Sequence, residues 1–162
     1  MPEPGATGAW RSGIGFDVHR FDPRRALWLA GVRIDDVDGL AGHSDGDVVS
    51  HSVADAFLGA AALGDVGQHF PDTDPAVTGI SGPALLGRTV ELLAAAGFAP
   101  SSVDVTVVCD RPAISPHREA MRETLAAAIG LPVARVSVKA TRPEGLGLTG
   151  DGIGCLAIAV IA

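Results

Sequence analysis

Two side chains near the start of the chain, Asp17 and His19, have the types and the spacing of metal ligands. They alternate with Phe16 and Val18, and this period of two predicts a half-buried strand with both polar side chains on one face. A carboxylate and an imidazole suit a borderline divalent ion such as Zn²⁺, which in catalytic sites usually has three protein ligands and one open position. Such a pair is also an ordinary hydrogen-bonded couple, so the zinc hypothesis requires a third ligand.

The candidate third ligand is His51, which lies in a stretch that reads as a helix and shares a helical face with Asp55 one turn later. Taken alone, His51 fits a hydrogen-bonded histidine of the core or the surface better than a metal ligand. The zinc hypothesis therefore depends on the convergence of Asp17, His19 and His51.

The composition sets limits on the fold and on the possible ligands. The 162 residues are 47% hydrophobic and 19% charged, which is typical of one globular domain with a real core. A net charge of -7 argues against a general binder of nucleic acid or of anionic membranes, because both require a basic surface. Any phosphate must therefore be bound locally. With no signal peptide or membrane-spanning run, we expect a cytoplasmic protein, and Cys109 and Cys155 read as buried thiols.

The pattern of apolar residues and turn formers predicts an α+β sandwich, with helices on one face of a mixed sheet. Residues 1–9, rich in Pro, Gly and Ala, read as a frayed tail before a single domain at 10–162. Strands are expected at 10–20, 26–32, 103–109, 136–141 and 155–161. Helices are expected from the segment after residue 47 to about 63, at 81–97 and at 117–129, with loops at 35–39 and 64–75.

The segment before the first helix, residues 43–47, is rich in capping residues. Ser44 or Asp45 is a candidate N-cap. In one interpretation this is only a capping turn. In the other, Ser44 and the free N–H groups of the helix start hold a phosphate, which the helix dipole favours.

Seven segments in a fixed order give the chain, from about Arg11 to its end, a resemblance to the 2-C-methyl-D-erythritol 2,4-cyclodiphosphate synthase family. They are FDVH at 16–19, AGHSDGD at 41–47, His51, LGDVG at 63–67, FPDTD at 70–74, KAT at 139–141 and EGLGLTG at 144–150. Each motif is modest, but the ordered set is highly specific.

The resemblance implies a homotrimer whose sheets face the three-fold axis and whose active sites lie between subunits. One subunit would supply the metal and the erythritol-phosphate pocket, and the next would supply the cytidine pocket. The substrate would be 4-diphosphocytidyl-2-C-methyl-D-erythritol 2-phosphate, cyclised with loss of CMP in non-mevalonate isoprenoid biosynthesis. Such an intramolecular phosphoryl transfer requires positioning and charge neutralisation more than covalent chemistry.

The resemblance also assigns roles to individual residues. Asp17, His19 and His51 would hold Zn²⁺, and Glu144 would hold Mg²⁺ or Mn²⁺ with the diphosphate. Asp55 would orient the metal-bound imidazoles, although it could also take a proton. The remaining site positions are His43 and Ser44 for the 2-phosphate end, Asp65 and Gly67 for the ribose, Phe70 and Asp72 for the erythritol pocket, Cys109, Pro112, Ala113 and Ile114 for cytosine, and Lys139, Ala140, Thr141 and Arg142 near the diphosphate.

The chain departs from the family pattern in its nucleotide half. Ala113 replaces a usual lysine, Arg142 and Pro143 follow Thr141 where a threonine is usual, and the segment 150–152 lacks an Arg-Gly pair. In one interpretation, Arg142 supplies the missing cation through bidentate phosphate contacts, and activity survives. In the other, the protein is a diverged paralogue, a trimeric metal- and phospho-ligand-binding protein with little or no cyclase activity.

Overall fold

A mixed five-stranded sheet forms one layer of the molecule. The structure is a computed structural model that describes residues 10–42 and 44–162, so the predictions for residues 1–9 and for His43 lie outside the described residues. The strand order is β2-β1-β5-β3-β4, and all neighbours are antiparallel except β3 and β4. The strands are β1 (Arg11–Leu29), β2 (Val32–Leu40), β3 (Pro100–Val108), β4 (Val136–Thr141) and β5 (Gly152–Ile161).

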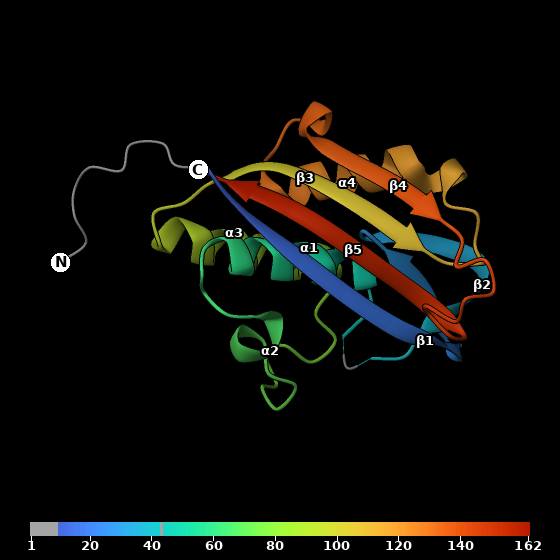
Figure 1. The fold of residues 1–162 in the computed structure, drawn as a ribbon. Coiled ribbons are helices and arrows are strands. Elements are labelled where there is room, and N and C mark those ends of the chain that lie inside the picture. Colours follow the sequence, from blue (N-terminus) through green and yellow to red (C-terminus); the bar gives the residue numbers. More distant parts are fainter. Residues whose placement is uncertain (1–9, 43) are drawn as a thin grey trace.

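The helices cover one face of this sheet, as Figure 1 shows. They are α1 (Val48–Ala60), α2 (Val66–His69), α3 (Gly82–Ala95) and α4 (Arg118–Ile129), with 3₁₀ turns η1 (Ser115–His117) and η2 (Val133–Arg135). The core lies between the layers and includes Phe57 of α1, Leu86 of α3 and Met121 of α4, all fully buried. The predicted α+β class, with helices on one face of a mixed sheet, is confirmed.

The first two strands differ from the prediction. The segment 26–32 is not a separate second strand, because β1 continues through the polar turn at Asp22 to Leu29 with a register irregularity between Asp22 and Ala26. The expected loop at 35–39 belongs to β2. The chain reverses at Ala30 and Gly31, both of which have positive φ. Asp and Gly residues in β2 read as a loop because their intrinsic preference for turns hides the pairing with β1 that stabilises them.

Two further details correct the sequence interpretation. The N-cap of α1 is Asp47, not Ser44 or Asp45, and its carboxylate accepts hydrogen bonds from Val49 N and Ser50 N. The predicted loop 64–75 contains the short helix α2. The helices near 81–97 and 117–129, and the strand 136–141, are confirmed within a few residues.

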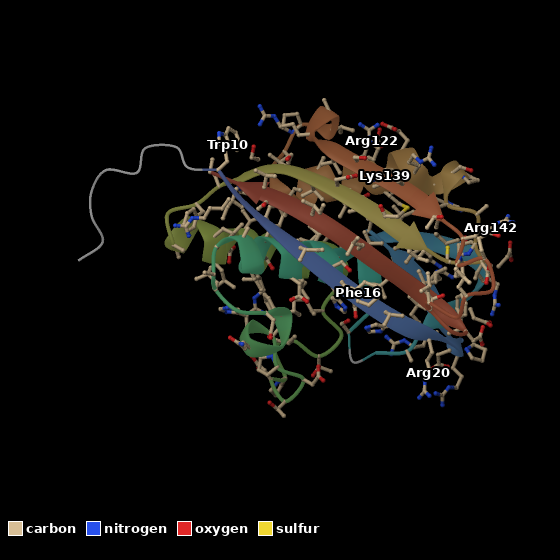
Figure 2. The ribbon with its side chains drawn as sticks, in the orientation of Figure 1. Trp10, Phe16, Arg20, Arg122, Lys139 and Arg142 are labelled. Carbon is tan, nitrogen blue, oxygen red and sulfur yellow. The ribbon has the colours of Figure 1, made fainter. Side chains whose placement is uncertain are left out.

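The face of the sheet away from the helices carries exposed apolar side chains. Ile14, Phe16 and Val18 of β1 are 65%, 56% and 43% exposed, and Leu156 and Ile158 of β5 extend the patch. We call these five residues the outer apolar face, and Phe16 is labelled in Figure 2. The alternation predicted for β1 is present, but in one chain its apolar side faces outward. Among the described residues, no helix has the length and apolar character needed to cross a membrane.

Candidate metal centre and nucleotide cavity

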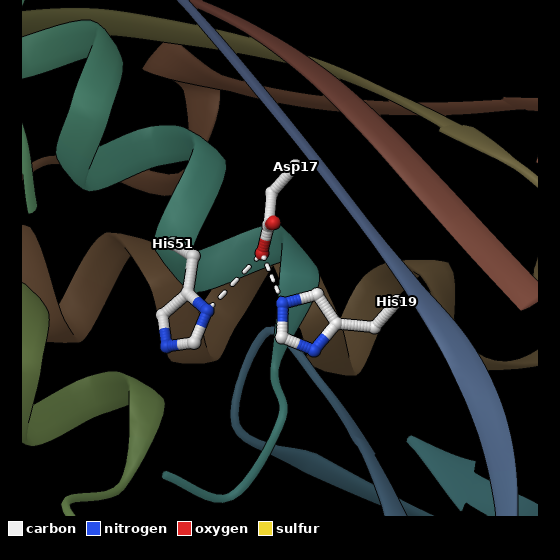
Figure 3. Close-up of side chains that lie close together, drawn as sticks. All are labelled: Asp17, His19 and His51. Atoms are coloured by element: carbon white, nitrogen blue, oxygen red, sulfur yellow. Dashed lines mark hydrogen bonds and ion pairs between the residues drawn. The ribbon is translucent and has the colours of Figure 1, made fainter. Parts of the chain in front are cut away.

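Asp17, His19 and His51 converge at one point between β1 and α1 (Figure 3). Asp17 Oδ2 lies 3.1 Å from His19 Nε2 and 3.1 Å from His51 Nδ1. One possible ligand atom from each residue lies within 4.8 Å of the others. The predicted convergence of these three side chains is therefore confirmed.

Close packing of β1 against α1 brings the three side chains together. Gly13 and Gly15 lie on the side of β1 that also carries Asp17. A Cβ at Gly15 would lie only 1.9 Å from the carbonyl oxygen of Ser52, and one at Gly13 would lie 2.1 Å from that of Ala56. Because glycine has no Cβ, the helix backbone can approach the strand backbone directly. His51, the neighbour of Ser52, thereby reaches Asp17.

Asp47 fixes the start of α1 and therefore the direction from which His51 enters the site. Its buried carboxylate caps the helix and also accepts hydrogen bonds from Ala30 N at 2.8 Å and Gly31 N at 2.7 Å. Burial raises the pKa of Asp47. Because Ala30 and Gly31 form the reversal between β1 and β2, one side chain ties this hairpin to the helix that carries His51.

The nitrogen of each imidazole that faces away from Asp17 has its own partner. His19 Nδ1 contacts the carbonyl oxygen of Ala41, and His51 Nε2 lies 3.0 Å from Ser44 Oγ. Arg25 donates from Nη1 to the carbonyl oxygen of Gly42 at 2.5 Å and from Nη2 to that of Ser44. A proton on His19 Nδ1, donated to Ala41, leaves Nε2 available as a ligand, which is the usual arrangement around metal-binding histidines.

The electrostatics of the cluster favour a charged carboxylate. Burial alone would raise the pKa of Asp17, but hydrogen bonds from His19 and His51 outweigh it and hold this pKa far below the ordinary value. The hydrogen bond to Asp17 raises the pKa of His19, although burial acts in the opposite direction. The carboxylate of Asp17 is therefore ionised, as a metal ligand must be.

The three side chains fit a zinc ion by chemistry and by spacing. One carboxylate oxygen and two imidazole nitrogens form a common donor set for catalytic zinc. Ligand atoms around tetrahedral zinc lie about 3.3 Å apart, close to the two 3.1 Å separations from Asp17 Oδ2. Two of the three separations between ligand atoms therefore already suit a tetrahedral ion.

A cavity of about 230 Å³ opens beside the metal ligands. Its lining includes the predicted site residues Ser44, Phe70 and Asp72, together with His19 and His51. The other lining residues, which sequence reasoning missed, are Gly42, Val66, Val77, Thr78, Ile80 and Leu85. Residues 77–80 carried no recognisable signal, because they line the cavity through the path of a loop and not through a reactive group.

Three predicted residues lie on or next to α2. Asp65 caps this helix by accepting a hydrogen bond from Gln68 N at 2.9 Å, and Gly67 lies within it. Asp55 accepts a hydrogen bond from Val66 N at 2.7 Å, and burial raises its pKa. Asp55 is thus hydrogen-bonded to the backbone of α2, whereas His51 Nδ1 is bonded to Asp17.

A second cavity, of about 310 Å³, collects the residues predicted for cytosine. It is lined by Cys109, Asp110, Pro112, Ala113, Ile114, Ser115, Arg118, Ala140, Thr141 and Arg142. Arg142 follows the end of β4 (Figure 2). Arg118 was missed, although its position six residues after Pro112 and at the start of α4 could have suggested it. Burial raises the pKa of Cys109 to about 11, so its thiol is neutral there.

Two predicted residues, Lys139 and Glu144, line neither of these cavities. Lys139 Nζ lies 2.6 Å from Asp104 Oδ2, a pair between neighbouring strands. Glu144 is exposed and has a φ of 52°. Among the described residues, Asp17, His19 and His51 form the one group of three possible metal ligands, and Glu144 is not part of it.

Fold and site together define an α+β protein with a candidate zinc centre beside one cavity and a second cavity at the ends of β3 and β4. Residues 10–162 match the sequence model of the YgbB family, and the chain belongs to that family. It is similar to proteins named 2-C-methyl-D-erythritol 2,4-cyclodiphosphate synthase. That of Symbiobacterium thermophilum is 51% identical, over 93% of this chain and 97% of the relative. That of Trichlorobacter lovleyi is 50% identical, over 93% and 96%. The family resemblance predicted from the motifs is confirmed.

Longer relatives and solved structures agree with this assignment. The bifunctional enzyme IspD/IspF of Novosphingobium aromaticivorans is 52% identical over 93% of this chain, and the chain spans 39% of that relative. A solved structure of 2C-methyl-D-erythritol-2,4-cyclodiphosphate synthase superposes with a TM-score of 0.87 at 34% identity, over 94% of this chain and 100% of the other. A form described as CDP-bound gives the same values.

Proposed function

We propose that the protein cyclises 4-diphosphocytidyl-2-C-methyl-D-erythritol 2-phosphate to 2-C-methyl-D-erythritol 2,4-cyclodiphosphate and releases CMP. The observation that carries this proposal is the convergence of Asp17, His19 and His51 beside a cavity of about 230 Å³. The names of close relatives that match nearly the whole of the chain support it.

In this proposal, the chain binds and orients the two phosphate groups that react. Ser44, which lines the metal cavity, holds the 2-phosphate, while Phe70 and Asp72 contact the methylerythritol. Zinc held by Asp17, His19 and His51 would polarise the diphosphate and neutralise its charge. Most of the rate acceleration would then come from orientation within a single substrate.

The second cavity is the proposed nucleotide site. Cytosine would be read by backbone groups around Pro112, and the phosphates of the nucleotide would be met by the cations Arg118 and Arg142 that line the same cavity. Guanidinium groups bind phosphate oxygens in pairs, so these arginines offset the lysine that is absent at Ala113. Glu144 stays the predicted ligand of Mg²⁺ or Mn²⁺ that arrives with the diphosphate.

We further propose that the active site is shared between chains of a homotrimer. The two cavities have no lining residue in common, although a single substrate must contact both. The outer apolar face, which is exposed in one chain, would be covered by the neighbouring subunits around a three-fold axis. Assembly would therefore both bury this face and bring a metal cavity next to a nucleotide cavity.

The activity is tested by incubating the purified protein with the diphosphocytidyl substrate, Zn²⁺ and Mg²⁺. We expect CMP and the cyclic diphosphate to form in equal amounts, as measured by ³¹P NMR. A linear phosphorylated product would indicate attack by water and a hydrolase. Binding of substrate without turnover would support the non-catalytic paralogue and contradict the proposed function.

The shared site is tested by mixing two variants of reduced activity. His51→Ala damages the metal cavity and Arg142→Ala damages the nucleotide cavity. Mixed trimers would contain some sites in which both halves are intact, so refolding the two variants together should restore part of the activity. Mixtures with no more activity than the separate variants would contradict a site built from two chains.

A further inference from the structure

Arg111 lies in the middle of the segment that lines the nucleotide cavity, yet its side chain extends away to other parts of the chain. Its guanidinium carbon is 4.1 Å from the centroid of the Phe21 ring. Nη1 is 3.5 Å from Asp151 Oδ1, and Nη2 is 3.8 Å from Asp38 Oδ2. Arg111 itself is not among the residues that line the cavity, whereas its neighbours Asp110 and Pro112 are.

These contacts join four segments that are distant in sequence. Phe21 belongs to β1, Asp38 to β2, and Asp151 to the turn before β5. The backbone N–H of Phe21 also donates to the carbonyl oxygen of Asp151 at 2.9 Å. The aromatic ring and the two carboxylates therefore sit on a framework that is already joined, and Arg111 attaches the nucleotide segment to it.

Other arginine pairs at the surface do not join distant segments. Arg24 pairs with Asp22 at 2.9 Å and Arg33 pairs with Asp35 at 3.0 Å, each two residues away on the same strand. Exposed pairs of this kind contribute little. The carboxylate pairs of Arg111 are exposed too, so what distinguishes it is the cation–π contact with Phe21. That contact, combined with two carboxylates from other segments, restrains a guanidinium better than a single ion pair does.

We propose that Arg111 is a positioning residue that holds the backbone of residues 109–114 in the form that reads cytosine. This role rests on the proposed function. Recognition through backbone groups requires the peptide units around Pro112 to be in place before the nucleotide arrives. A segment that is ordered only on binding loses part of its affinity to that ordering.

Calorimetric titration with CMP tests the role. Arg111→Ala should raise the dissociation constant for CMP by roughly 5- to 30-fold, in line with the loss of a stack and a weak ion pair. The KM should rise while kcat at saturating substrate and the zinc affinity stay unchanged. Arg111→Lys keeps the charge but loses the guanidinium group that contacts both the Phe21 ring and the two carboxylates, so its CMP affinity should lie closer to that of Arg111→Ala than to that of the parent. Arg33→Ala is the matched control and should bind CMP like the parent.

Hydrogen exchange of the nucleotide-free protein gives a second readout. Arg111→Ala should speed amide exchange within residues 109–114 and leave α1 unchanged. Parent-like CMP affinity in Arg111→Ala would overturn this role alone. So would an equal loss of zinc affinity and CMP affinity, because that would indicate general destabilisation. A parent protein that binds no CMP would overturn the nucleotide role and the proposed function together.

Discussion

Replacing Gly15 by alanine tests whether backbone contact between β1 and α1 builds the metal centre. The new Cβ would lie 1.9 Å from the Ser52 carbonyl oxygen and 2.8 Å from Ala56 N. Both neighbours are backbone atoms, so no side-chain rotation can relieve the contact. Ordinary van der Waals separation would require the helix to move away from the strand by about 1.5 Å.

This displacement would separate His51 from Asp17, since His51 directly precedes Ser52 on the helix. Misplacing a catalytic group by about 1 Å can cost a hundredfold in rate. We therefore expect kcat/KM to fall by about 100-fold and zinc affinity to fall with it. Forcing extra volume into a packed interface should also lower the free energy of unfolding by about 1–3 kcal/mol.

The same helix provides a matched control. Gly59 of α1 is exposed, and a Cβ there would come no closer than 4.0 Å to Ile14 O. Gly59→Ala should raise stability by about 0.5–1 kcal/mol, because alanine favours a helix over glycine, and should leave zinc affinity unchanged. Zinc titration and urea unfolding of both variants compare the two sites. Parent-like zinc affinity in Gly15→Ala would refute the idea that this approach positions His51.

Three further predictions concern the site itself. His51→Ala should lose zinc, as measured by metal analysis, and at least about a thousandfold in turnover, with an unchanged circular dichroism spectrum; retained activity would remove the metal proposal. Arg142→Thr should lower kcat/KM by about 10- to 100-fold, because a charged phosphate contact is lost, and a rise would contradict its compensating role. The interaction with Asp17 that raises the pKa of His19 also stabilises the zinc-free folded protein. This stabilisation is fully present below the unfolded pKa near 6.5 and is lost as the pH rises through the folded pKa. Urea unfolding across pH 5 to 9 should show the free energies of unfolding of the zinc-free parent and of His19→Gln converging towards pH 9. A difference in free energy that stays constant with pH would contradict the assignment.

The sequence indicated the ligands well because their spacing follows directly from strand geometry. Asp17 and His19 are two residues apart, so an extended backbone places them on one face wherever the strand lies. The direction of that face was not evident. Ile14, Phe16 and Val18 read as the buried side of β1, yet they are exposed. Hydrophobic alternation alone does not reveal whether the apolar side of a strand faces the core.

The elements around the ligands were harder to predict because their causes are distant in sequence. Asp47 has a turn-like sequence around it, and Ser44 and Asp45 are equally good caps by type. The difference arises from the β1–β2 reversal, which offers the N–H groups of Ala30 and Gly31 to the Asp47 carboxylate. A side chain that can satisfy both a helix start and a hairpin at once is favoured over one that caps the helix alone.

The same reasoning explains why Gly13 and Gly15 could not be read as site residues. In a strand, glycine usually signals a weak point or a bulge, and nothing in the local sequence reveals which element will pack on it. Only the fold shows that the helix backbone of Ser52 and Ala56 occupies the space that side chains at these positions would fill. The candidate metal centre therefore depends on two residues without side chains as well as on its ligands. The close approach of the strand and helix backbones at these glycines brings Asp17 Oδ2 within 3.1 Å of His51 Nδ1.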